Sequence, residues 1–305
     1  VNITSTTGAA LDIQCGKRID IIVEDGTTNT LTDYASGSQK AAFNCQGHLE
    51  FSGAGSLTIK GNAKHALRAK EYILLKKSFG SLTVASAASD GIHCGEYFQM
   101  NGGTVKVSDT AGDGIQVETA TTSDEVQNGM FIVNGGSIEV SVTAQDVKGI
   151  RLDADSANTA TVPLMQLLDG SITVELASTA ISSKGIATDG HLTIGSSSSS
   201  PVVGVSVLAS ASNKTGRATG IKVGKSDDDD DYNGTGYFTI SSGTTNVNVN
   251  ANYGRGINTN YLISNGGSLT VTASGTSVQY IKLGGSSSVY YKNNGGTVTP
   301  TDKFK

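Results

Sequence analysis

The sequence predicts an all-β protein folded as a single right-handed parallel β-helix, a solenoid of about ten rungs with three short strands in each rung. The main observation is a repeat: Gly80 and Gly103 each open an alternating strand that leads to a Gly-Ile step, at 91–92 and at 114–115. The 23-residue return distance suits three strands and three tight turns. The repeat is strand-like throughout and has no helical period, which favours a solenoid over helical repeats.

The composition supports the same class. Charged residues make up 16% of the chain and Trp is absent, whereas Gly contributes 39 of the 305 residues. This balance suits stacked strands and tight turns better than charge-coated helices. The net charge of −5 disfavours nucleic acid as a partner, and no apolar run approaches the length of a membrane span. The chain begins at Val1 without a signal peptide, as in a mature or trimmed chain, and we expect a monomer.

The elements follow one another in a single domain, residues 1–305. Residues 1–34 are expected to form the N-terminal rung and cap, residues 35–295 the regular rungs, and residues 296–305 the C-terminal end. The rungs open at Gly55, Gly80, Gly103, Gly136, Gly170, Gly243, Gly267 and Gly296, with a degenerate opening at Gly204. The middle strands carry Ala66-Leu67 and then Gly-Ile at 91–92, 114–115, 149–150, 185–186, 220–221 and 256–257. Asn side chains before the Gly-Gly turns are expected to stack and hydrogen-bond along the solenoid, at Asn101, Asn134, Asn265 and Asn294.

The cysteines are interpreted through the register of the rungs. Alignment on the Gly-Ile step places Cys15, Cys45 and Cys94 in one inward-facing column, which continues through apolar residues such as Val117. Cys45 and Cys94 would lie two rungs, or about 9–10 Å, apart, too far for a disulfide. We therefore expect three buried, reduced thiols, with a bridge between Cys15 and Cys45 as the alternative.

Three acidic insertions lengthen the connection between the middle and third strands, at 118–127, 153–161 and 225–235. Insertions gathered on one edge of a solenoid usually mark its working edge. We therefore expect the functional residues to lie there.

Several motifs occur in an order that resembles a known family: 29–33 (Asn-Thr-Leu-Thr-Asp), 40–43 (Lys-Ala-Ala-Phe), 53–59, and 112–115 (Gly-Asp-Gly-Ile). Together they look like the secreted bacterial parallel β-helix proteins described as carbohydrate-binding domain proteins, which are similar in fold to the pectate lyases of polysaccharide lyase family nine. The resemblance covers residues 10–150 well and the remainder as looser repeats. It implies binding of cellulose or polygalacturonate, bound calcium, and a secreted or cell-surface location.

Acidic residues at the working edge are the candidate calcium ligands. Asp90 and Asp113 occupy one column on adjacent rungs, so their carboxylates should lie about 5 Å apart. Hard oxygen ligands suit calcium, which takes six to eight of them. The alternative is that Asp before Gly is only turn chemistry. The first set of candidates is Asp90, Asp113, Glu118, Asp124, Asp153 and Asp155. A second set follows the opening spacing of a calcium loop, at Asp229, Asp231 and Asn233. The acidic residue expected at its twelfth position is Ile240 instead, so a solvated acidic loop is the alternative there.

An outward column at the start of the third strand is rich in tyrosine, and it includes Tyr72, Tyr97, Tyr237, Tyr261 and Tyr290. Aromatic faces stack on the apolar faces of sugar rings, although a Tyr beside a turn can also simply cover that turn. The adjacent outward column of the middle strand supplies polar groups for sugar hydroxyls or uronate carboxylates. Its candidates are Arg68, His93, Gln116 and Arg151. The four histidines lie on separate rungs without a partner at zinc-binding spacing, so no zinc site is expected.

The leading functional hypothesis is non-catalytic, calcium-assisted binding of an extracellular polysaccharide such as pectate or cellulose. The alternative is a calcium-dependent uronate lyase, in which Lys148 or Arg151 would abstract the proton α to the carboxylate. A third class, a surface adhesin, would need an exposed apolar patch, and the sequence shows none.

Overall fold

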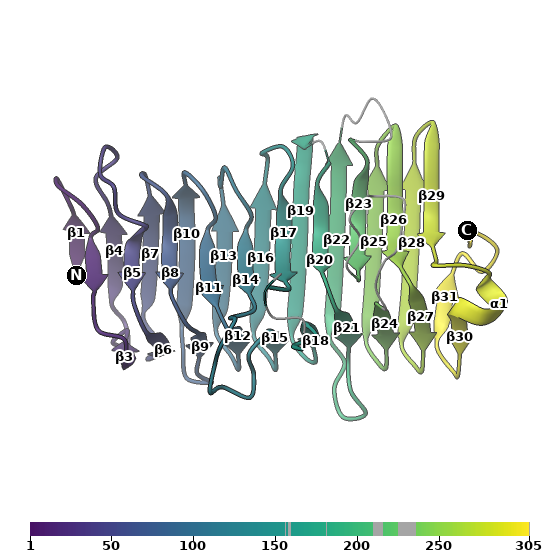
Figure 1. The fold of residues 1–305 in the computed structure, drawn as a ribbon, viewed down its shortest axis with the longest axis horizontal. Coiled ribbons are helices and arrows are strands. Elements are labelled where there is room, and N and C mark those ends of the chain that lie inside the picture. The colour runs from purple at the N-terminus through teal and green to yellow at the C-terminus, as the bar shows by residue number, and fades with distance from the viewer. Residues whose placement is uncertain (156, 158–159, 181, 210–215, 225–235, 305) are drawn as a thin grey trace.

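The computed structural model is an elongated stack of strands whose colour runs evenly from one end to the other, with the two termini at opposite ends (Figure 1). It describes residues 1–304 except 156, 158–159, 181, 210–215 and 225–235. Three parallel sheets of 11, 10 and 10 strands run along the long axis. Every third strand belongs to the same sheet. This arrangement is the parallel β-helix with three strands per rung that the sequence predicts.

The rungs follow the order sheet A, sheet B, sheet C. Sheet A contains β1 (Asn2–Thr4), β4 (Thr28–Thr32), β7 (Ser56–Gly61), β10 (Ser81–Ala87), β13 (Thr104–Ser108), β16 (Ser137–Val142), β19 (Ser171–Ala180), β22 (Val202–Ala209), β25 (Thr244–Asn250), β28 (Ser268–Ser274) and β31 (Thr297–Thr299). Sheet B contains β2 (Leu11–Ile13), β5 (Ala41–Cys45), β8 (His65–Ala69), β11 (Ile92–Gly95), β14 (Ile115–Glu118), β17 (Lys148–Asp153), β20 (Lys184–Thr188), β23 (Ala218–Val223), β26 (Tyr253–Thr259) and β29 (Ser277–Lys282). Sheet C contains β3 (Arg18–Ile22), β6 (His48–Ser52), β9 (Ile73–Leu75), β12 (Tyr97–Met100), β15 (Met130–Val133), β18 (Leu164–Leu167), β21 (His191–Ile194), β24 (Tyr237–Ile240), β27 (Tyr261–Ser264) and β30 (Tyr291–Asn293).

The described residues contain one short helix, α1 (Ser287–Tyr290), near the C-terminal end. No helix in the described part of the chain could span a lipid bilayer.

Alternation of side chains along each strand builds the core. In β25, for example, Val247 and Val249 are buried while the intervening Asn residues are exposed. Equivalent residues of successive rungs stack, as the parallel Phe98 and Phe131 rings do at a centroid distance of 5.0 Å. Burial of this continuous apolar interior is what holds one rung on the next, because a single rung cannot cover its own apolar face.

The predicted inward column of sheet B is present, with one correction. Cys45 and Cys94 are buried and lie in the same column as Val117. Cys15 is exposed, contrary to the prediction, because Ile13 and not Cys15 pairs with Cys45. The strand β2 ends at Ile13, so Cys15 falls in the turn that follows it. All three thiols are free, as predicted.

The turns also follow the sequence pattern. Asn134 donates a hydrogen bond to Asn101 at 2.8 Å and Asn294 donates one to Asn265 at 2.6 Å, so the predicted Asn ladder exists. Two of the acidic insertions connect sheet B to sheet C, one between Glu118 and Met130 and one between Asp153 and Leu164. The third, at 225–235, lies outside the described residues.

Candidate functional site

The first two tyrosines of the predicted column are buried. The register places Tyr97 opposite Met130 and next to Tyr72, as expected, but Tyr72 and Tyr97 are only 5% and 6% exposed. Their rings stack on each other at 4.3 Å. This burial corrects the prediction that they present ring faces to a sugar.

The surroundings of these two rings are polar and closed. The Tyr72 hydroxyl donates a hydrogen bond to Glu50 at 2.9 Å, and burial together with this carboxylate raises the pKa of Tyr72 to about 12. The insertion that follows β14 lies near the pair, because its residues 122–125 line a cleft with His48, whose ring is 4.3 Å from that of Tyr72. Tyr72 and Tyr97 therefore act as packing residues between the sheet and this loop.

Three tyrosines at the other end of the column remain accessible. Tyr237 is 38% exposed, and Tyr261 and Tyr290 are half-buried. Neighbouring ring centroids are 4.7 Å apart in both pairs, and the first pair is nearly parallel, with an interplanar angle of 12°. The rings face one another at this spacing, so their faces are largely occupied. They therefore present ring edges and a row of hydroxyls to solvent, rather than the flat surfaces that the sequence suggested.

The polar column of sheet B forms an internal network on the outer surface. Arg68 donates to Asn44 at 3.2 Å, and Gln116 donates to Asp153 at 3.1 Å. Arg151 donates to Asp153 at 2.6 Å and lies 3.2 Å from a carboxylate oxygen of Asp113. Burial alone would lower the pKa of Arg151, but the two carboxylates outweigh it and raise that pKa. These predicted sugar-binding groups are held in position by neighbouring Asn and Asp side chains.

The two aspartates before the Gly-Ile steps do not face a common cation. Asp90 accepts the backbone N–H of Asp113 at 2.9 Å, and Asp113 in turn accepts the backbone N–H of Lys148 at 2.7 Å. Each carboxylate thus binds the backbone of the next rung and is balanced by nearby cationic or imidazole side chains. The pKa of Asp113 is raised, chiefly by burial. The turn-chemistry alternative describes these two residues better than a shared calcium ion does.

The acidic residues that follow sheet B separate into two clefts. Glu118, Asp153, Asp155 and Asp189 line one cleft of about 360 Å³, together with Arg151. Four carboxylates and one guanidinium make this cleft strongly negative. Thr121 donates a hydrogen bond to Asp155, and Ala154 donates its backbone N–H to Asp189 at 3.1 Å.

Asp124 lies elsewhere, in a second cleft that it shares with Glu125, Glu71, Glu96 and His48. His48 pairs with Glu71 at 2.8 Å. Burial raises the pKa of Glu96, and its Oε2 has no hydrogen-bond partner among the described residues. The structure therefore does not bring Asp124 to the other predicted calcium ligands. Asp229, Asp231 and Asn233 lie outside the described residues.

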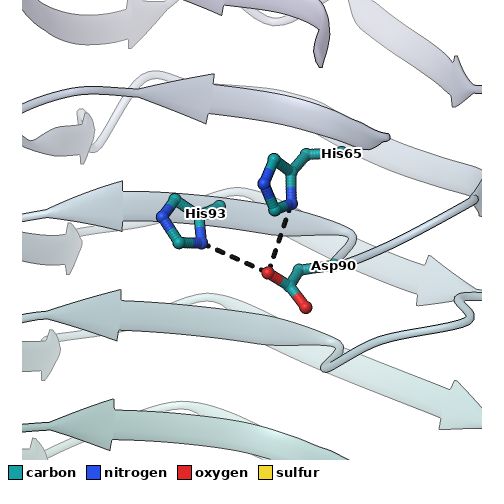
Figure 2. Close-up of side chains that lie close together, drawn as sticks. All are labelled: His65, Asp90 and His93. Carbon is teal, nitrogen blue, oxygen red and sulfur yellow. Dashed lines mark hydrogen bonds and ion pairs between the residues drawn. The ribbon is translucent and has the colours of Figure 1, made fainter. Parts of the chain in front are cut away.

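A cluster that the sequence reading did not anticipate lies on sheet B: His65 at the start of β8, Asp90 just before β11, and His93 within β11 (Figure 2). Both imidazole Nδ1 atoms lie 3.2 Å from the same Asp90 oxygen, Oδ2. Burial acts to raise the pKa of Asp90, but the two histidines outweigh it and lower that pKa. The register contained the signal, because His65 shares the Asp90 column and His93 lies three residues after Asp90.

The first cleft and the accessible tyrosines lie on the same edge of the solenoid, where sheet B passes into sheet C. One residue from each of six consecutive rungs marks this edge: Glu118, Asp153, Asp189, Tyr237, Tyr261 and Tyr290. We call these six residues the edge strip. Asp189 is separated by one residue from His191, whose ring contacts Tyr237 at 5.2 Å, so the acidic and aromatic parts adjoin. At the usual strand spacing the strip is about 24 Å long.

Comparisons with known proteins point to one family. The model of the family described as carbohydrate-binding domain-containing protein matches residues 1–222, which include the acidic cleft and end before the accessible tyrosines. No curated protein and no solved structure gives a significant match. The match spans well over half of the chain, so this protein belongs to the carbohydrate-binding domain-containing protein family.

Proposed function

We propose that this protein binds a linear extracellular polysaccharide of the plant cell-wall type, such as pectate or cellulose, along the edge strip, without cleaving it. Membership of a carbohydrate-binding family supports the class of ligand. The main support for placing the glycan at the edge strip is that the acidic cleft and the tyrosine row adjoin and together extend over six rungs. A linear glycan has the shape to follow such a strip, since both are extended and repetitive.

The chemistry of the strip suits sugar hydroxyls. Carboxylates of the acidic cleft accept hydrogen bonds from them, and charge-assisted hydrogen bonds of this kind are stronger than neutral ones. The tyrosines add hydroxyls that both donate and accept, with apolar ring edges beside them. Exposed Lys292, in the strand next to Tyr290, supplies a cation for a uronate carboxylate. Both neutral and acidic glycans therefore have complementary groups here.

We further propose that calcium assists glycan binding at the acidic cleft by bridging carboxylates of the protein and of the glycan. Glu118, Asp153, Asp155 and Asp189 are the hard oxygen donors that calcium prefers, and carboxylates of a bound uronate would complete the set. No three carboxylates of this cleft stand within ligand distance of a common point among the described residues. Calcium binding here therefore relies on oxygens of the glycan as well.

The lyase alternative is weaker on chemical grounds. A lyase needs a group that accepts a proton, and Arg151 is held protonated by Asp113 and Asp153, which raise its pKa. The Lys148 ammonium donates to the backbone carbonyl of Asp146 at 3.3 Å. Neither side chain is placed as an uncommitted base.

Retention of the protein on polygalacturonate and on cellulose, measured by affinity electrophoresis, tests the proposal. The Tyr237→Phe/Tyr261→Phe double variant keeps the stacked rings and removes two hydroxyls. Each lost hydrogen bond is worth about 0.5–1.5 kcal/mol, so affinity should fall by about fivefold to 100-fold. Tyr34→Phe is the matched control, because Tyr34 is 40% exposed on a different edge of the solenoid.

Chelator provides the second arm of the same assay. Removing calcium should weaken retention on polygalacturonate more than on cellulose, and Asp153→Asn should abolish the difference. Equal affinity of the double variant and wild type for every glycan bound would reject the edge strip as the site. A sustained rise in ultraviolet absorbance on polygalacturonate, from an unsaturated uronate product, would favour the lyase instead.

A further inference from the structure

The group formed by His65, Asp90 and His93 has the composition of a transition-metal site. Among the His, Cys, Asp and Glu side chains of the described residues, these three alone form a group whose ligand atoms all lie within 4.8 Å of one another. Two imidazole nitrogens and one carboxylate oxygen are ligands that zinc and related divalent ions take. Calcium, by contrast, is bound by oxygen ligands.

The distances match a coordination shell. Zinc binds imidazole nitrogen and carboxylate oxygen at about 2.0–2.2 Å, so two ligands of a tetrahedral ion are about 3.4 Å apart. Asp90 Oδ2 lies 3.2 Å from His65 Nδ1 and 3.2 Å from His93 Nδ1. Figure 2 shows both Nδ1 atoms turned toward this one oxygen. The two imidazole rings are stacked, with centroids 4.5 Å apart and an interplanar angle of 25°, so both side chains must rotate to direct their lone pairs at one ion.

A second observation points to a ligand at the same place. His65 is 4% exposed, and its Nδ1 makes no hydrogen bond of good geometry among the described residues, although it lies 3.2 Å from the Asp90 carboxylate. A buried polar atom that lacks a well-formed hydrogen bond destabilises the fold. A metal ion would remove this penalty by accepting the nitrogen lone pair.

The surrounding groups hold the ligands as outer-shell partners of metal sites do. Asp90 Oδ1 accepts the backbone N–H of Asp113 at 2.9 Å, which leaves Oδ2 directed at the imidazoles. The other nitrogen of His93, Nε2, lies 3.7 Å from a carboxylate oxygen of Glu118. Glu118 would fix the ring and strengthen His93 as a ligand if it closed from 3.7 Å to hydrogen-bond distance.

We infer that His65, Asp90 and His93 bind one divalent transition-metal ion of the zinc type, with one coordination position left for water. The ion joins adjacent rungs, because His65 belongs to β8 and His93 to β11. A metal bound only by the folded state also raises its stability by mass action. The three ligands lie outside the edge strip, although His93 neighbours its first residue, Glu118, and the inference does not depend on the proposed function.

Calorimetric titration of untagged wild-type protein with zinc chloride tests this inference. One equivalent of zinc should bind. His93→Gln should weaken this binding by about tenfold to 100-fold or more. His48→Gln is the matched control, because His48 also faces a carboxylate, Glu71, at 2.8 Å but belongs to no group of three ligands. Its zinc affinity should equal that of wild type.

A measurement on the wild-type protein covers the case in which a variant does not fold. Nitrogen-15 spectra of the imidazoles should show the Nδ1 signals of His65 and His93 shifting with one equivalent of zinc. Absence of stoichiometric binding, or equal affinity in the folded His93→Gln and His48→Gln variants, would overturn the inference. Because the assay contains no glycan, either result leaves the proposed function untouched.

Discussion

At the scale of single residues, the carboxylates of this protein serve different roles that depend on their position in a rung. Asp90 and Asp113 precede the Gly-Ile steps and accept backbone N–H groups of the next rung. Asp153 and Asp189 follow sheet B and line a cleft. Glu96 sits in a turn with a φ of 77° and is 6% exposed. The same chemical group therefore bonds the backbone, lines a cleft or is buried according to the turn that carries it.

Glu96 should make stability depend on pH. Burial raises its pKa in the folded state, whereas in the unfolded chain a glutamate titrates near about 4.3. Between these two pKa values the folded state holds more protons, so the free energy of unfolding falls as pH rises through that window. Glu96→Gln removes this loss, and its stability relative to wild type should increase from pH 4 to pH 7, by at most about 1.4 kcal/mol per pH unit.

Urea unfolding of both proteins at several pH values measures this difference. Glu175→Gln, which replaces an exposed glutamate on sheet A, controls for the loss of a surface carboxylate. A stability difference that stays constant, or that shrinks toward pH 7, would show that burial does not raise the pKa of Glu96 in the folded state.

Residue exposure was the least predictable property from the sequence. Register assigned Tyr72, Tyr97 and Tyr237 to one column correctly, but exposure depends on the loops that lie over that column. Tyr72 and Tyr97, near the insertion after β14, are 5% and 6% exposed, whereas Tyr237 is 38% exposed. The predicted burial of Cys15 was wrong because the inward column was extended past the end of β2, into the turn that follows it.

At the scale of elements, glycine in the Gly-Ile step is set by close packing between sheets. A Cβ on Gly149 would lie 2.2 Å from Val174 and 2.7 Å from the carbonyl oxygen of Gly185 on the next rung. An added Cβ on Gly114 or Gly220 would meet the same two kinds of neighbour, a valine of sheet A and a carbonyl of the next rung. The repeating glycine thus lets the second strand of one rung pack closely against the first strand of the next rung.

Gly149→Ala should therefore destabilise the fold by about 1–3 kcal/mol, the usual effect of overpacking. Gly204→Ala is the matched control, since it lies in strand β22 and an added Cβ there meets nothing within 4 Å. That substitution should be neutral or stabilising by roughly 0.5 kcal/mol. Urea midpoints compare the two, and equal losses of stability would contradict this role of the Gly-Ile glycine.

The elements themselves were predictable because their pattern repeats. A 23-residue period with Gly at fixed places specifies three strands and their pairing, and the observed pairing of Leu82 with Val105 follows it directly. The metal cluster was not predicted, although its residues were aligned. The spacing of the histidines along the chain does not reveal the cluster, because a solenoid brings residues of neighbouring rungs to within about 5 Å of each other.

At the scale of the whole molecule, the solenoid turns sequence repeats into surfaces that run along one axis. The edge strip has one residue from each of six rungs, and its two chemical parts, acidic and aromatic, come from residues as far apart as Glu118 and Tyr290. A repeated, extended ligand matches such a surface because successive units meet equivalent positions. The metal cluster lies on neighbouring rungs at the N-terminal side of this strip, beside Glu118.

Nuclear magnetic resonance of protein with carbon-13-labelled tyrosine rings tests the edge strip most directly. The ten tyrosines can be assigned by Tyr→Phe substitution and followed during titration with a short oligogalacturonide. The ring signals of Tyr237, Tyr261 and Tyr290 should shift together along one saturating curve, while those of buried Tyr72 and Tyr97 stay in place. Saturable binding that leaves the signals of Tyr237, Tyr261 and Tyr290 unmoved would contradict the account.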